Sequence, residues 1–155
     1  MARFHDPLAA AGFSTGVATY EDSYPGDEGA ARIVLSVSVE GRISTQAVVD
    51  TGAPWCILDP ELARRVGVSA DEGYTPATRL SIRGILYTGS LHAMSIGLRN
   101  EREGDDLEIP ATVFVPKILP EETWPHPNFL GLTGLLDRIR FAVDPVENAF
   151  YFGPL

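Results

Sequence analysis

The sequence predicts an all-β protein with one or two short helices. The 155 residues include 15 glycines and 12 prolines, and so many turn residues indicate short elements rather than a helical bundle. Runs of β-branched and aromatic residues recur between these turns, which is typical of strands. Residues 59–67 carry helix signals at both ends, so we expect one helix of about two turns there.

Length and charge limit the architecture and the kinds of partner. A chain of 155 residues is expected to form one domain with a real core, and 45% hydrophobic and 21% charged residues are typical of a soluble globular protein. The formal net charge of −9 argues against nucleic acid or an anionic membrane as the main partner. It mainly promotes solubility.

The cysteine and histidine residues indicate neither disulfides nor metal. Cys56 is the single cysteine, so no disulfide can form within the chain; its thiol is either reactive or, as a small buried hydrophobe, inert. His5, His92 and His126 lack metal-ligand spacing, and no cofactor is expected. The sequence shows no signal-peptide pattern and no apolar run near the roughly 20 residues that cross a bilayer, so we expect a cytoplasmic protein.

Turn residues divide the chain into an arm and a domain. Residues 1–29 are expected to form an N-terminal arm and loop, with a first strand within Phe13–Tyr20, and residues 30–155 the folded domain. Within the domain, Ile33–Val39 and Ile43–Val49 predict a β-hairpin because tight-turn residues separate them.

The remaining elements follow in short steps. In the helix of residues 59–67, Asp59 is the expected N-cap, Pro60 the first helical residue and Gly67 the stop. The other predictions are a short strand at Trp55–Leu58, a long hairpin over Thr78–Leu98 with Arg83–Gly84 near its tip, a charged surface loop at Asn100–Asp106, a strand at Leu107–Val115, a proline-rich loop at Pro116–Asn128, a short strand at Phe129–Gly131, a helical turn at Leu132–Asp137, and a closing hairpin of Ile139–Val143 with Ala149–Phe152.

A carboxylate stands at the end of one predicted buried strand. Asp50 directly follows Val48 and Val49, and burying a carboxylate is costly unless it is paired, hydrogen-bonded or neutralised. Thr51 adds a hydroxyl, and Gly52 allows a close approach that a Cβ would forbid. Asp50 is therefore either a catalytic-type carboxylate or part of a structural Asx turn.

These residues resemble a known catalytic loop. Val48–Ala53 is similar to the loop of the aspartic proteases, two hydrophobic residues followed by Asp, Thr or Ser, Gly, and Ala or Ser. The tripeptide alone is expected by chance in very roughly one chain in thirty of this length. Phe129–Gly131 resembles the family strand that passes behind this loop. With a single Asp-Thr-Gly and the matching element order over residues 30–143, the chain resembles the retropepsin-like members, which implies a retropepsin-like acid protease barrel.

The resemblance implies an activity that needs two chains. In this family two aspartates share a proton and activate one water for peptide hydrolysis. With one Asp-Thr-Gly, the active form would be a homodimer in which Asp50 of each chain meets at the two-fold axis. Asp50 would be the catalytic carboxylate of an endopeptidase acting on peptides or proteins. Thr51 would bond across to the partner's loop, and Gly52 would let the substrate backbone approach.

The hairpin around Arg83–Gly84 lies where the family has its flap, the hairpin that covers bound peptide. Tyr87 either lies over the cleft or packs between strands, and Trp124 and His126 either line a groove or pack their own loop. The residues expected to contact substrate are Ala53, Arg83, Gly84, Ile85, Tyr87 and Leu130.

The chain also departs from the viral members. Pro54 and Leu132 stand where many of those proteins have an Asp–Arg pair, and the hairpin tip is not glycine-rich as theirs is. The viral chain ends interleave in the dimer, whereas this chain has a longer start and ends in Phe150–Leu155. Two alternatives stay open. One is a non-catalytic peptide-binding or dimerisation module with a retropepsin-like fold. The other is an unrelated β-barrel in which Asp50 caps a turn and Phe129–Gly131 lies far away.

Overall fold

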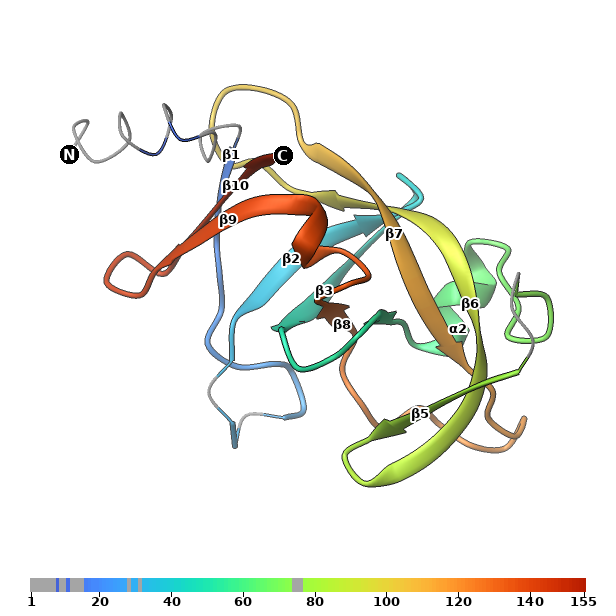
Figure 1. The fold of residues 1–155 in the computed structure, drawn as a ribbon. Coiled ribbons are helices and arrows are strands. Elements are labelled where there is room, and N and C mark those ends of the chain that lie inside the picture. Colours follow the sequence, from blue (N-terminus) through green and yellow to red (C-terminus); the bar gives the residue numbers. More distant parts are fainter. Residues whose placement is uncertain (1–7, 9–10, 12–15, 28, 31, 74–76) are drawn as a thin grey trace.

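The computed structural model describes residues 8, 11, 16–27, 29–30, 32–73 and 77–155. In these residues the protein consists mostly of β-strands, as predicted, and no helix among them is long and apolar enough to span a membrane (Figure 1). In chain order the elements are β1 (Gly16–Thr19), β2 (Val34–Val39), β3 (Ile43–Asp50), β4 (Cys56–Ile57), α2 (Pro60–Arg65), β5 (Thr78–Ile82), β6 (Ile85–Leu98), β7 (Leu107–Pro116), β8 (Phe129–Gly131), the 3-10 helix η1 (Leu136–Arg138), β9 (Ile139–Asp144) and β10 (Ala149–Pro154).

The larger sheet closes into a barrel. Its strand order over the described residues is β2-β3-β8-β4-β7-β6-β5, and β2 also pairs with β6 through Val37–Val39. The closed ring therefore runs through β2, β3, β8, β4, β7 and β6, with β5 attached to β6 outside the ring. β8 pairs in parallel with β3, so two segments about 80 residues apart in the chain (Phe129 against Val48) end side by side.

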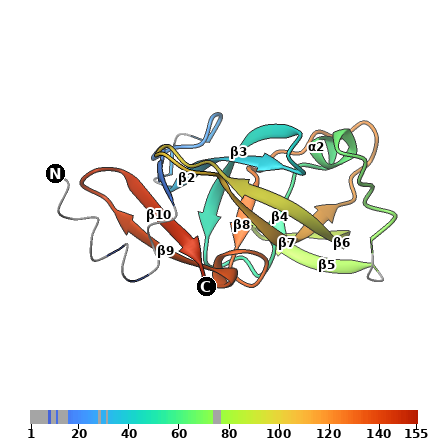
Figure 2. The same ribbon diagram turned by 90° about the horizontal axis from the view of Figure 1, so that it is seen from above.

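A smaller sheet joins the two ends of the described chain. β10 lies between β1 and β9 and pairs antiparallel with both. In Figures 1 and 2 this sheet and the β5–β6 hairpin lie at opposite ends of the molecule. The first strand predicted within Phe13–Tyr20 is present as β1, while residues 13–15 lie outside the described residues. Both long edges of β10 are occupied by strands of its own chain.

The charged loop of residues 100–106 has a structural contact that the sequence analysis missed. The Asn100 side-chain oxygen accepts from the Val17 N–H at 3.3 Å. A Glu101 carboxylate oxygen accepts from both the N–H and the hydroxyl of Thr19, each at 2.7 Å. Because the other edge of β1 pairs with β10, this loop covers the edge that β10 leaves open.

The long hairpin turns where the sequence predicts. Arg83 and Gly84 join β5 to β6 and have φ values of 50° and 82°. A two-residue turn with positive φ at both positions matches the twist of antiparallel strands. The tip of the hairpin is therefore Arg83–Gly84.

Helix α2 also begins and ends as predicted. The Asp59 carboxylate accepts from the Glu61 N–H at 2.8 Å, Pro60 is the first helical residue, and Gly67 has a φ of 84°. Leu62 is buried against the barrel. The helix thus buries one face, with Leu62 and Ala63, against the barrel and exposes the other.

Candidate active site

Asp50 is the last residue of β3 and lies in register with Gly131 of β8. The Gly52 N–H donates to Asp50 Oδ1 at 2.9 Å, and the Ala53 N–H donates to the Asp50 carbonyl at 3.2 Å. The Asx turn is thus present, and it holds the half-buried carboxylate in one orientation. Thr51 and Gly52 are exposed beside it.

β8 and the residues after it fix this turn from behind. The Leu132 N–H donates to the Ala53 carbonyl at 2.7 Å, and the Gly134 N–H donates to the Pro54 carbonyl at 2.9 Å. Residues 132–135 form turns and the 3-10 helix η1 covers only Leu136–Arg138, so the helical turn predicted over Leu132–Asp137 forms only at its C-terminal end. The alternative of an unrelated barrel with Phe129–Gly131 far from Asp50 is wrong.

Asn128 is a positioning residue that the sequence analysis missed. It is 3% exposed; its side-chain oxygen accepts from the Asp59 N–H at 2.8 Å, and its amide donates to the Gln46 carbonyl at 3.0 Å. It therefore joins β3, the start of β8 and the N-cap of α2. The available signal was an amide directly before a buried apolar run, because a buried amide needs several hydrogen-bond partners.

A cleft of about 300 Å³ opens beside the Asp50 turn. Asp50, Gly52 and Ala53 line it from the turn, and Leu80, Ile82 and Arg83 line it from the hairpin. A larger polar hollow of about 530 Å³ lies on β2 and β3, and its lining contains none of the predicted site residues. The cleft, rather than the larger hollow, is the candidate active site.

The structure brings only some of the predicted substrate-binding residues into the cleft. Ala53 and Arg83 line it, whereas Gly84 and Ile85 are exposed at the hairpin tip. Leu130 is 1% exposed in the core. Arg32, Pro54, Ile57, Leu80, Ser81, Ile82 and Phe129 also line the cleft and were missed.

Tyr87, Trp124 and His126 form a packed aromatic group. The Tyr87 hydroxyl and His126 Nε2 are 2.9 Å apart, and the Tyr87 and Trp124 ring centroids are 5.0 Å apart. Trp124 is 7% exposed. These contacts fit the packing interpretation of all three residues, because the rings join the proline-rich loop to the hairpin.

Cys56 is fully buried in β4, and burial raises the pKa of its thiol to about 11. A thiol with this pKa is protonated near neutral pH and is a poor nucleophile. The burial of Cys56 therefore fits its interpretation as a small, inert, buried hydrophobic residue.

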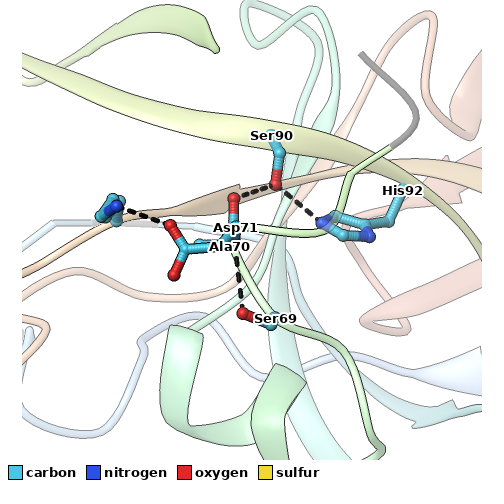
Figure 3. Close-up of polar contacts among 6 residues, drawn as sticks. Ser69, Ala70, Asp71, Ser90 and His92 are labelled. Carbon is cyan, nitrogen blue, oxygen red and sulfur yellow. Dashed lines mark hydrogen bonds and ion pairs between the residues drawn. The ribbon is translucent and has the colours of Figure 1, made fainter. Parts of the chain in front are cut away.

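Ser90 and His92 on β6 fasten the loop between α2 and β5 (Figure 3). The Ser90 hydroxyl donates to the Ala70 carbonyl at 2.6 Å, and His92 Nε2 lies 2.8 Å from the same hydroxyl oxygen. Since the single hydroxyl proton is directed at Ala70, His92 Nε2 carries the proton of the second bond. The pair is therefore a structural contact and not an activated serine.

Acidification is expected to weaken the fold through His92. Burial lowers the pKa of His92 below 6.5, and the charge of Glu72 partly offsets this. The unfolded chain then binds more protons than the folded one, so the stability present above about pH 6.5 is lost as the pH falls through the folded pKa. Urea unfolding at about pH 7 and about pH 5 should show a smaller loss in His92→Gln than in wild type. Equal losses would contradict this prediction.

The closed barrel, the Asp50 turn against β8 and the hairpin beside the cleft define a retropepsin-like fold. No protein-family model and no curated protein matches the sequence. Among solved structures, the chain is similar to a retropepsin-like aspartic protease from Rickettsia conorii, with a TM-score of 0.56 and 18% identity over 90% of this chain and 94% of that one. It also aligns with the retroviral protease-like domain of Ddi1 from Leishmania major, with a TM-score of 0.48 and 16% identity over 80% of this chain and 94% of that one. The Rickettsia alignment shows that the fold is retropepsin-like, as predicted.

Proposed function

We propose that the protein is a homodimeric aspartic endopeptidase in which two Asp50 carboxylates activate a water for peptide hydrolysis. A fold alone does not fix a function. The observation that carries the proposal is the placement of Asp50, half-buried on a hydrogen-bonded turn and lining a cleft together with the hairpin. A carboxylate held in one orientation in a cleft that a hairpin also lines fits a reacting group better than a turn cap.

The chemistry requires a second carboxylate, which the partner chain would supply. Two carboxylates within hydrogen-bond distance share one proton, because both cannot be ionised at once. The ionised Asp50 takes a proton from the water while the water oxygen attacks the peptide carbonyl carbon. The protonated Asp50 of the other chain donates to the developing oxyanion, which gives a neutral tetrahedral intermediate. When this intermediate collapses, the C–N bond breaks, the first Asp50 passes the proton taken from the water to the leaving nitrogen, and the other Asp50 recovers its proton from the hydroxyl that becomes the new carbonyl.

The surface around the turn suits this arrangement. Thr51 and Gly52 are exposed, so the proposed two-fold axis passes beside them and Thr51 can bond to the partner's loop. The viral type of interleaved terminal sheet does not suit this chain, because β10 already pairs with β1 and β9. Peptide would lie between the turn and the hairpin tip, where Arg83, Gly84 and Ile85 are exposed.

The test is cleavage of a mixed peptide library between about pH 3 and about pH 7 over a series of protein concentrations. For a dimer, the cleavage rate per chain rises with concentration until dimers dominate and then levels off. Sedimentation at the same concentrations gives the dimer fraction. Activity from monomers alone would contradict the shared site. No cleavage by a folded dimer would favour the non-catalytic peptide-binding module.

A further inference from the structure

Two arginines line the cleft beside Asp50. Arg32 precedes β2, and Arg83 stands at the tip of the β5–β6 hairpin. Both bind the same carboxylate, because Asp27 Oδ2 lies 3.0 Å from an Arg32 nitrogen and 2.7 Å from an Arg83 nitrogen. The hydrogen bond from Arg83, together with the charges of both arginines, holds the pKa of Asp27 below its ordinary value.

The two guanidinium groups have more donors than Asp27 uses. Each guanidinium carries five N–H donors in a planar fork suited to carboxylates. Arg32 Nε is buried and has no hydrogen-bond partner among the described residues. The Arg83 guanidinium lies 6.0 Å from the ring centroid of Phe129, another cleft residue, and its side chain is 37% exposed. The Arg32 Nε is itself closed off, but the Arg32 and Arg83 side chains are 20% and 37% exposed, so both guanidinium groups offer donors to the cleft that also holds Asp50.

The Asp27–Arg83 ion pair also links the hairpin to a segment 56 residues away in the sequence. A hairpin that moves to admit peptide has to break or share this pair, and a carboxylate on the peptide would compensate for the loss. The overall net charge of −9 would repel an acidic peptide. A preference for acidic peptides would consequently come from these two arginines and not from the overall electrostatic field of the protein.

We propose that Arg32 and Arg83 form a carboxylate subsite that selects peptides with an Asp or Glu side chain beside the hairpin tip. Asp27 is the internal carboxylate with which that side chain competes. This inference rests on the proposed function in one respect, namely that the bound peptide is a substrate. The recognition itself is a binding property and can be measured without cleavage.

The binding experiment uses the Asp50→Asn protein, which holds peptide without the catalytic carboxylate. The probes are acetylated and amidated octapeptides with one Glu, each matched by the same peptide with Gln, and a third set with neutral side chains and a free C-terminal carboxylate. We expect the Glu peptides to bind about five- to tenfold more tightly at about 50 mM NaCl, with the advantage shrinking at about 500 mM. In the Asp50→Asn background, Arg83→Met should remove the advantage, and Asp27→Asn should increase it.

Arg79→Met is the matched control, because Arg79 lies exposed on β5 and is not among the cleft-lining residues; the advantage should persist in this variant. Arg32→Met in the Asp50→Asn background should also reduce the advantage. If Arg32→Met fails to fold, Arg32→Lys, which keeps the charge but loses the planar fork, is measured in its place. Equal binding of Glu and Gln peptides, an advantage that survives Arg83→Met, or preference for the free C-terminus would overturn the subsite.

Wild-type cleavage separates this inference from the proposed function. Glu-selective binding without any cleavage would leave the subsite standing and remove the endopeptidase. Cleavage of Glu and Gln peptides at equal rates would support the endopeptidase and overturn the carboxylate subsite.

Discussion

Replacing Asp50 with Asn is expected to lower kcat/KM for peptide cleavage by at least about 10³-fold. Asn has nearly the shape of Asp and keeps a side-chain oxygen that can accept from the Gly52 N–H, now 2.9 Å from Asp50 Oδ1. The turn should therefore persist, while the group that takes a proton from water is lost. Steady-state cleavage of the best library peptide measures the effect, and thermal unfolding checks the fold.

Asp59→Asn is the matched control for this change. Asp59 caps α2 through the Glu61 N–H, and Asn is an equally good N-cap, so cleavage should stay near the wild-type level. A second experiment mixes wild-type protein with an excess of Asp50→Asn protein. If the active unit is a dimer that exchanges subunits, mixed dimers carry one carboxylate and wild-type activity falls. Undiminished cleavage by Asp50→Asn alone would remove Asp50 from the mechanism.

Local signals predicted the elements that position the site. The Arg83–Gly84 tip and the Asp59 N-cap depend on residues within a few positions of each other, so turn and capping preferences were sufficient. The expectation that Phe129–Gly131 lies behind the Asp50 loop came instead from the resemblance of two separate motifs, whereas the parallel pairing of Asp50 with Gly131 was not predicted. Periodicity within either strand cannot show which strand lies beside it.

The contacts that were missed connect distant parts of the chain. Asn128 bonds to Gln46, 82 residues away, and Arg83 bonds to Asp27, 56 residues away. Such pairs form only once the barrel has closed, and a polar residue in a turn-rich loop gives no local sign of its partner. The loop at 100–106 was interpreted as merely solvated for the same reason, since its bonds to Val17 and Thr19 depend on where β1 lies.

Replacing Gly131 with Ala is expected to lower the free energy of unfolding by about 3 kcal/mol, the upper end of the usual range for overpacking. A Cβ at this position would lie 2.2 Å from the Trp55 carbonyl oxygen and 2.9 Å from that of Ala53. Both are backbone atoms, which cannot rotate away as a side chain can. The turn that carries Asp50 would have to shift relative to β8, so cleavage should fall along with stability. Urea unfolding and peptide cleavage measure the two effects.

Gly29→Ala is the matched control, since a Cβ there has nothing within 4 Å and should change stability by no more than about 0.5 kcal/mol. A Gly131→Ala protein that unfolds at the same urea concentration as Gly29→Ala would mean that the turn moves freely away from β8. In that case β8 would not hold the carboxylate in place. If stability falls but the remaining folded protein cleaves at the wild-type rate per molecule, β8 supports the barrel without setting the position of Asp50. A fall in both, with activity lost per folded molecule, is the result that a positioning role requires.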